Sequence, residues 1–314
     1  MKISINNGDS AVYTGYGHAT LKLMANLAKT KHSVVMNRPC EFEMTFSHPQ
    51  NYVFLNPDSY KIGYTAWEST DIPDDWHEGL AKIDELWVPN QFTKDSLSSH
   101  TDKPIYIFKH GLDPIYEPRK RTYDGVLKFL HVGYPAVRKN LPDVVNAFLE
   151  LYKGREDVHL TIKAYENCEI PFINEPNITV IAKTYSTTQM IDLLHSHHVM
   201  VYPSWGEGFG LIPLQALGSG MPAIVTEGWC DYSEYMPDLM IKSKLSYSPW
   251  LTYHPGKMFK PDFEHLKELM LYCENNITFL LERHFNVSKQ IHEEWNWEKV
   301  VSEHFDGVEA RLVV

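Results

Sequence analysis

Several features that define major protein classes are missing from this chain of 314 residues. No apolar run approaches the roughly 20 residues of a membrane-spanning helix, and the first ten residues, MKISINNGDS, lack the apolar core of a secretory signal. The cysteines are far apart, without the paired spacing of a zinc site or a disulfide framework: Cys40, Cys168, Cys230 and Cys273. We find no short repeat and no low-complexity stretch. We therefore expect a cytoplasmic protein without a transmembrane segment.

Positive charge is also scarce. The chain has 40 acidic and 29 basic side chains, a net charge of −11, and residues 1–115 hold 14 acids and 10 bases. A protein that holds nucleic acid mainly by neutralising phosphates needs an excess of Lys and Arg, so neither half is such a basic module. A local basic groove is still compatible with these numbers. The 43% of hydrophobic and 22% of charged residues are typical of globular proteins.

Short apolar runs alternate with helical patterns, which indicates an α/β protein with parallel sheets. The length predicts two domains at roughly 150 residues each. In the first part we expect helices over Ala19–Lys29 and Asp74–Lys82, a glycine-bearing loop Tyr13–Gly17, and strands at Lys2–Asn6, Ser33–Met36, Tyr52–Leu55, Ile62–Thr65, Glu85–Val88 and Ile105–Phe108. This domain ends near Lys109, and His110–Pro114 is a predicted linker because Gly and Pro flank polar residues there.

The second part repeats the α/β pattern. Predicted strands are Lys128–Val132, His159–Ala164, Ile178–Ile181, Val199–Tyr202 and Ala223–Thr226. Predicted helices are Leu141–Tyr152, Thr188–Ser196, one that runs through Ala216, and the last, Trp297–Leu312, in a mostly helical remainder. We therefore divide the chain into residues 1–113, residues 114–293, and a C-terminal helix in residues 294–314.

The segment Tyr202–Thr226, YPSWGEGFGLIPLQALGSGMPAIVT, is the most informative one. An apolar strand leads into a glycine-rich turn, and a helix follows at once. The first turn of a helix offers unpaired N–H groups and partial positive charge, which suit a phosphate or a sugar hydroxyl. Glycine lets the backbone approach a ligand closely, and Glu207 at the turn can accept hydrogen bonds from sugar hydroxyls. A plain tight turn between strand and helix would look similar.

EGFGLIPLQALGSGMPAIVT resembles the signature of the family 4 glycosyltransferases: a glutamate, seven residues, a second glutamate, a small-residue helix and G-x-P. Four more segments match that family in the same order. They are the Gly15–Gly17 loop, YTAWESTDIPDDWHEGLAKIDELWVPNQFTKDS (64–96), KHGLDPIY (109–116) and FLHVGYPAVRKNLPDVVNAF (129–148). The resemblance spans nearly the whole chain, and the short first domain and the composition suggest a phage or viral form.

The resemblance implies the GT-B architecture, two Rossmann-like domains facing across a cleft with a C-terminal helix that crosses back to the first domain. The nucleotide-sugar donor would bind mainly to the second domain and the acceptor to the first. Open α/β sheets bind ligands at the carboxyl ends of their strands, which agrees with this placement. On the donor side the resemblance places Gly15, Gly17, Gly133, Gln215 and the backbone N–H groups of Phe209, Gly210 and Leu211.

Glycosyl transfer leaves negative charge on the departing diphosphate, and a cationic group must stabilise it. Many glycosyltransferases use a metal held by Asp-x-Asp, a motif that this sequence lacks. Arg138 and Lys139 follow a predicted strand, and an Arg fork with a Lys point charge suits a diphosphate. In the family a basic pair at this place contacts the diphosphate. We therefore expect catalysis by Arg138, Lys139 and Glu207 without a metal or another cofactor; retention of configuration is implied by the resemblance alone.

Two departures from the family pattern bear on activity. Gln215 stands where the second signature glutamate normally accepts hydrogen bonds from the ribose, and an amide offers a single acceptor oxygen and no charge. Tyr134 stands where many relatives carry a second arginine. A nucleotide-sugar-binding protein that has lost turnover is therefore the alternative to an enzyme.

On the acceptor side, Glu68 matches a glutamate of the family segment, and His110 lies in the predicted linker. Each also has a plain structural interpretation, as a capping carboxylate and as a linker residue. His195, His197 and His198 lack a carboxylate or cysteine at ligand spacing, so we expect no metal site there.

The identity of the acceptor stays open between a glycan, a lipid-linked sugar, a small molecule and a modified nucleobase. A duplex-DNA acceptor would need a basic groove in the first domain, where acids outnumber bases. Peripheral membrane contact is possible through residues 19–31, which include three lysines.

Overall fold

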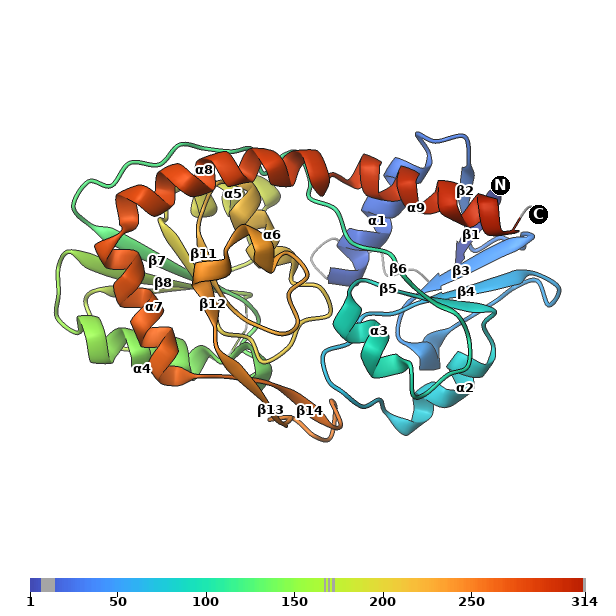
Figure 1. The fold of residues 1–314 in the computed structure, drawn as a ribbon, viewed down its shortest axis with the longest axis horizontal. Helices are drawn as coiled ribbons and strands as arrows, with labels where there is room; N and C mark the ends of the chain where they lie inside the picture. Colours follow the sequence, from blue (N-terminus) through green and yellow to red (C-terminus); the bar gives the residue numbers. More distant parts are fainter. Residues whose placement is uncertain (7–14, 167, 169, 171–172, 313–314) are drawn as a thin grey trace. The chain divides into compact units, whose positions relative to one another are not determined.

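The computed structural model describes residues 1–6, 15–166, 168, 170 and 173–312. Of the predicted loop Tyr13–Gly17, Gly15 to Gly17 are among these residues, and Tyr13 and Thr14 lie outside them. The chain divides into two compact units (Figure 1). Unit 1 comprises Met1–Gly111, Leu251–Gly256 and Glu294–Val314, and unit 2 comprises Leu112–Trp250 and Lys257–Glu293. No helix in the described part of the chain is both long and apolar enough to span a membrane.

Unit 1 is built on a parallel sheet with the strand order β2-β1-β3-β4-β5-β6. The strands are β1 (Lys2–Asn6), β2 (Ser33–Met36), β3 (Phe42–Phe46), β4 (Tyr60–Tyr64), β5 (Glu85–Val88) and β6 (Ile105–Ile107). The helices are α1 (Gly15–Leu27), α2 (His77–Ala81), α3 (Gln91–Leu97) and α9 (Trp297–Leu312), and 3₁₀ turns precede α2 and follow β3.

Each face of this sheet has its own hydrophobic core. On one face, α1 and α9 pack on β1, β3 and β4 through residues such as Leu23 and Phe305. On the other face, Trp67, Trp76 and neighbouring apolar side chains form a second cluster. Strand β5 contributes to both, since Trp87 belongs to the first cluster and its neighbours Leu86 and Val88 to the second. A strand of a doubly covered parallel sheet alternates in this way.

The predicted strand Tyr52–Leu55 is wrong, and β3 replaces it in the sheet. Glu43 lies inside β3, and its carboxylate, fully buried, accepts hydrogen bonds from Asn6 Nδ2 (2.8 Å) and from the backbone N–H groups of Cys40, Leu55 and Asn56. The N–H groups of residues 55 and 56 are therefore bound to a side chain of β3 and make no strand ladder. A charged residue in the middle of FEMTF hides this strand from a hydrophobicity pattern.

Unit 2 contains a second parallel sheet, with the order β12-β11-β10-β7-β8-β9. Its strands are β7 (Leu127–Val132), β8 (Val158–Ala164), β9 (Ile178–Ala182), β10 (Val199–Tyr202), β11 (Ala223–Thr226) and β12 (Met240–Ile241). Its helices are α4 (Leu141–Tyr152), α5 (Thr187–His195), α6 (Leu211–Gly218), α7 (Phe263–Asn275) and α8 (Ile277–Glu294). Helices lie on both sides of the sheet (Figure 1). The predicted α/β class is confirmed.

An antiparallel hairpin interrupts the region that we expected to be mostly helical. It consists of β13 (Ser243–Tyr247) and β14 (Lys257–Pro261), which pair only with each other. Residues 244–247 of β13 alternate Lys-Leu-Ser-Tyr, a strand pattern of period two, whereas β14, KMFKP, has no such alternation. The hairpin and the preceding strand β12 correct the prediction for residues 240–261.

Candidate active site

Two loops at the carboxyl ends of neighbouring strands build the candidate site in unit 2. After β7, residues Val137–Lys139 form a 3₁₀ turn that ends at Asn140, whose φ of 58° is left-handed, and α4 starts there. After β10, the glycine-rich segment leads into α6. The pairing of β7 with β10 places both loops at one edge of the sheet, where open α/β sheets bind their ligands.

These loops bring the three predicted catalytic residues into direct contact. Glu207 Oε1 accepts from Lys139 Nζ at 2.6 Å and from Arg138 Nη1 at 2.9 Å. The same oxygen accepts from Ser204 Oγ at 2.6 Å and from Tyr202 Oη at 3.2 Å. Arg138, Lys139 and Glu207 therefore form one ionic cluster of net charge +1. Together with Tyr202 and Ser204 they make five residues, which we call the Glu207 cluster.

Burial makes this cluster electrostatically strong. The exposed fraction of Glu207 is 6%, and the Arg138 and Lys139 side chains are mostly buried. Burial alone would raise the pKa of the Glu207 carboxyl, but the two cations and the hydrogen bonds outweigh it and hold that pKa below its ordinary value. Burial raises the pKa of Tyr202 well above its ordinary value, so this phenol keeps its proton and donates.

Tyr202 and Ser204 were not among the predicted site residues. Tyr202 Oη also accepts from Lys139 Nζ at 2.7 Å, so it contacts one cation and the carboxylate of the cluster. Both residues lie in the YPSWGE segment, at the point where β10 ends. Polar side chains at the carboxyl end of a parallel strand were the available signal.

Backbone contacts hold the two loops together. Trp205 N donates to Arg138 O at 2.8 Å, and Arg138 Nη1 donates to Gly206 O at 2.8 Å. Trp229 Nε1, from the loop after β11, donates to Ser204 O at 3.0 Å. The cations are therefore fixed by the same loop that carries Glu207, a rigid arrangement suited to stabilising developing charge.

The start of α6 requires a glycine. Gly210 has a φ of +86°, and a Cβ there would lie 2.6 Å from atoms of Trp229 and Tyr232. Phe209 is buried with its ring against that of Tyr232, and Leu211 is the first residue of α6. Gln215 lies on α6 and is buried. Four of the predicted donor residues, Phe209, Gly210, Leu211 and Gln215, therefore lie in or directly before α6, close to Glu207 along the chain.

Gly133 follows β7 beside the cluster. A Cβ at this position would lie 3.8 Å from the Lys139 side chain and 3.9 Å from His131 Nε2. His131 Nδ1 lies 2.9 Å from the carbonyl oxygen of Val201. Burial lowers the His131 pKa to about 4, so its imidazole is neutral near pH 7 and adds no positive charge to the site.

The predicted site residues of unit 1 lie in different surroundings. Gly15 and Gly17 are in the first turn of α1. Glu68 Oε2 lies 3.0 Å from Nε2 of the buried His254, a partner that no motif indicated. His110 is buried between the rings of Tyr64 and Trp297, and burial lowers its pKa to about 3. The structure thus gives His110 a packing role, and a ligand contact by it stays a prediction.

The three neighbouring histidines have separate partners. His195 Nε2 lies near Glu117 O, His197 Nε2 near Thr161 Oγ1, and His198 Nδ1 accepts from Lys128 N. Within the described residues, no group of three His, Cys, Asp or Glu side chains is arranged to hold a metal ion.

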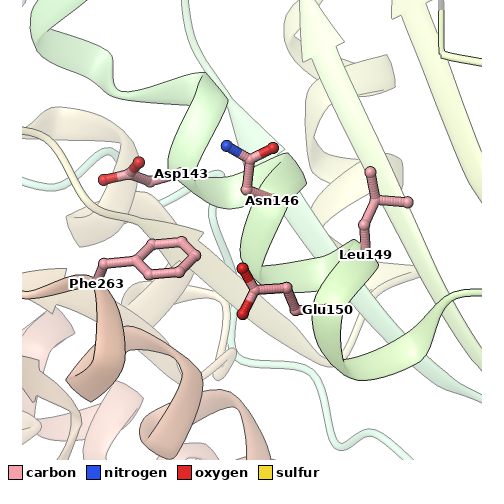
Figure 2. Close-up of a pocket in the computed structure, with 5 residues that line it drawn as sticks. All are labelled: Asp143, Asn146, Leu149, Glu150 and Phe263. Carbon is pink, nitrogen blue, oxygen red and sulfur yellow. The ribbon is translucent and has the colours of Figure 1, made fainter.

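A pocket of about 310 Å³ lies between α4 and α7 (Figure 2), and none of its five lining residues belongs to the Glu207 cluster. Its lining includes the carboxylates of Asp143 and Glu150 beside Phe263. Asp143 accepts from Asn140 Nδ2, and Glu150 forms an ion pair with Lys267 at 2.6 Å. Acidic lining does not suit a diphosphate, so we do not assign the donor to this pocket.

Comparison with known proteins points to one class. Residues 89–228 match the model of a family described as "Family 4 Glycosyltransferase in conflict systems", a range that includes the whole Glu207 cluster. A search among curated proteins found no match.

Solved structures resemble the chain over its full length. Sucrose-phosphate synthase from Thermosynechococcus elongatus has a TM-score of 0.73 at 12% identity and covers 100% of this chain and 99% of its own. HepE from Anabaena, in complex with UDP and glucose, has a TM-score of 0.68 at 9% identity. The match covers 98% of this chain and 99% of HepE. WaaG, a glycosyltransferase involved in lipopolysaccharide biosynthesis, has a TM-score of 0.63 at 12% identity. The match covers 97% of this chain and 98% of WaaG. The predicted GT-B fold is confirmed, and the match over residues 89–228 confirms the predicted resemblance to family 4 glycosyltransferases and supports a glycosyltransferase.

Proposed function

We propose that the chain transfers a sugar from a nucleoside-diphosphate sugar to a hydroxyl acceptor, with retention and without a metal ion. The observation that carries the proposal is the Glu207 cluster, which places two cations and a carboxylate at the N-terminus of α6. A leaving diphosphate needs such preorganised positive charge. Arg138 and Lys139 supply it from side chains, which is why we expect turnover without metal.

Each residue of the cluster has a separate part in this proposal. Arg138 and Lys139 neutralise the leaving diphosphate, and the backbone N–H groups of Phe209, Gly210 and Leu211 bind the donor at the helix N-terminus. Glu207 holds the two cations in place and accepts hydrogen bonds from the donor sugar. Gln215 contacts the ribose, and Gly133 leaves room for the nucleotide. Gly15 and Gly17 stay predicted donor contacts.

Uridine diphosphate sugars are the first donors to test, because the HepE structure of the same fold contains UDP and glucose. We assign the acceptor to unit 1, where Glu68 is the candidate contact. The Glu68 carboxylate keeps some exposure, whereas the buried carboxylate of Glu43 in β3 accepts from four N–H donors. The pairing with His254 supports a fixed orientation of Glu68 toward a hydroxyl.

The second candidate function is binding of a nucleotide sugar without turnover. Gln215 favours it, because an amide in a buried position of α6 binds ribose hydroxyls less strongly than a carboxylate. Such a protein would retain its donor without consuming it.

Nucleotide release from UDP-, GDP-, ADP- and TDP-sugars, measured in EDTA, separates the two functions. We expect release from one donor and its loss in Lys139→Ala. Absence of release, together with thermal stabilisation by one of these sugars, would establish the binding protein. Release that stops on adding EDTA would contradict metal-independent transfer.

A further inference from the structure

The β13–β14 hairpin carries a concentration of positive charge that is unusual for this acidic chain. Residues 242–261 contain four lysines (Lys242, Lys244, Lys257 and Lys260) and no acidic residue, although the whole chain has 40 acids and a net charge of −11. All four lysines are exposed. The structure gives no ion pair for Lys242, Lys244 or Lys260 with any described residue.

The strand register places like charges together. Lys244 lies directly opposite Lys260, a cross-strand pair that destabilises a sheet by itself. The nearest acids along the chain have other partners, since Asp238 forms an ion pair with Arg283 at 2.7 Å and Asp262 caps α7. Lys242, Lys244 and Lys260 therefore carry positive charge that no acidic side chain of the described residues pairs with.

Exposed apolar side chains accompany the lysines. The exposed fractions are 73% for Tyr247, 49% for Leu245 and 39% for Trp250. Tyr247 lies opposite Lys257, whose Nζ is 5.9 Å from its ring centroid, on the face of the ribbon that Lys244 and Lys260 do not occupy. The two faces of the ribbon thus both carry lysine, and one of them adds an accessible aromatic ring.

The hairpin is attached to the loop of the candidate donor site. Phe259 N donates to Trp205 O at 2.9 Å, and Lys260 Nζ lies 5.7 Å from the centroid of the Trp205 ring. Trp205 is two residues before Glu207. Whatever binds the hairpin is therefore held next to the Glu207 cluster.

We propose that the β13–β14 hairpin, with its lysines and the ring of Tyr247, is a binding surface for single-stranded nucleic acid. Aromatic rings stack on unpaired bases while lysines neutralise the adjacent phosphates. Lysines on both faces fit a phosphate backbone that passes around the ribbon, whereas a flat lipid surface would meet one face only. Four lysines are few for a duplex. The proposal concerns binding and does not depend on transferase activity, but it favours a nucleobase over a lipid as the acceptor.

Fluorescence anisotropy with labelled dT20 and rU20, using the full chain at 50 mM salt, tests the surface directly. If all four lysines contact phosphates, the logarithm of affinity falls with that of salt at a slope of roughly −2.8, and affinity falls about 20-fold between 50 and 150 mM. The double variant Lys244→Glu/Lys260→Glu should weaken binding at least tenfold, and Tyr247→Ala about fivefold or more. Lys244→Arg/Lys260→Arg keeps the charge and should bind like the unmodified chain.

The matched control is Lys120→Glu/Lys289→Glu, which changes the net charge equally at two other exposed lysines of unit 2. Near-normal binding by this control supports a local surface. The proposal is overturned by absence of oligonucleotide binding at 50 mM salt, by equal losses in the hairpin and control variants, or by a preference for anionic phosphatidylglycerol vesicles over both oligonucleotides. Circular dichroism of each variant separates these outcomes from unfolding.

Discussion

Replacing Glu207 by alanine tests the balance of charges in the cluster. The substitution leaves the partly buried Arg138 and Lys139 beside each other without the carboxylate that both contact. Removing one partner of a buried ion pair typically costs about 3–5 kcal/mol, and the partial exposure of the two cations places the loss near the lower value. We therefore expect Glu207→Ala to reduce the free energy of unfolding by about 3 kcal/mol.

Nucleotide binding should respond in the opposite sense to stability. A diphosphate supplies the negative charge that the variant lacks, so UDP should bind Glu207→Ala at least as tightly as the unmodified protein. At 100 times the dissociation constant, UDP then returns about 2.7 kcal/mol of stability. Release of nucleotide from the sugar donor should nevertheless be lost, because Glu207 contacts the sugar in our proposal.

Urea unfolding with and without UDP, followed by a release assay, measures all three quantities. Glu150→Ala is the control, because Glu150 forms an exposed ion pair with Lys267, which is worth about 1 kcal/mol or less. A Glu207→Ala protein that keeps its full stability would refute the buried cluster. A folded variant that no longer binds UDP would refute the assignment of the diphosphate to the two cations.

Three further outcomes follow from the structure. Glu43→Gln should lower the free energy of unfolding by about 3 kcal/mol, because an amide can replace only part of a carboxylate that accepts four N–H groups, and it should leave UDP binding unchanged. Gly210→Ala should destabilise the chain by about 1–3 kcal/mol and weaken UDP binding, because its φ is left-handed and a Cβ would clash with two buried rings. A normal affinity of this variant for UDP would contradict the helix N-terminus as a donor contact. The free energy of unfolding should fall as the pH drops from about 6.5 toward 4, because burial lowers the pKa of several histidines in the folded chain and the unfolded chain then binds more protons. These histidines are His110, His131, His197 and His284. A urea-unfolding free energy that stays constant between pH 7 and 5 would contradict their burial.

Much of unit 2 could be predicted from the sequence because its signals are local. Val199–Tyr202 and Ala223–Thr226 are uninterrupted apolar runs and are strands in the structure, and Leu141–Tyr152 is a helix with the predicted bounds. These elements have one burial pattern each, which periodicity detects. Arg138, Lys139 and Glu207 were identified by a resemblance, and it did not indicate that they contact one another.

The missed features depend on contacts between distant residues. Strand β3 contains Glu43, whose carboxylate accepts from Asn6, 37 positions before it, and from Asn56, 13 positions after it. Ser204 and Tyr202 acquire their role only because β7 and β10 are neighbours in the sheet. The pairing of Glu68 with His254 joins residues 186 positions apart. A single sequence contains no signal for such pairs.

The most direct test of the central assignment is the rate of nucleotide release from the preferred donor in Lys139→Ala, with EDTA present throughout. Lys139 supplies one of two cations to the leaving diphosphate in our account, and loss of one such group typically lowers the rate 100- to 1,000-fold. Lys153→Ala, at an exposed lysine of unit 2, is the control and should keep the full rate. A 100-fold or greater loss in Lys139→Ala alone is the predicted result. An unchanged rate in Lys139→Ala would contradict the assignment of the diphosphate to this cluster.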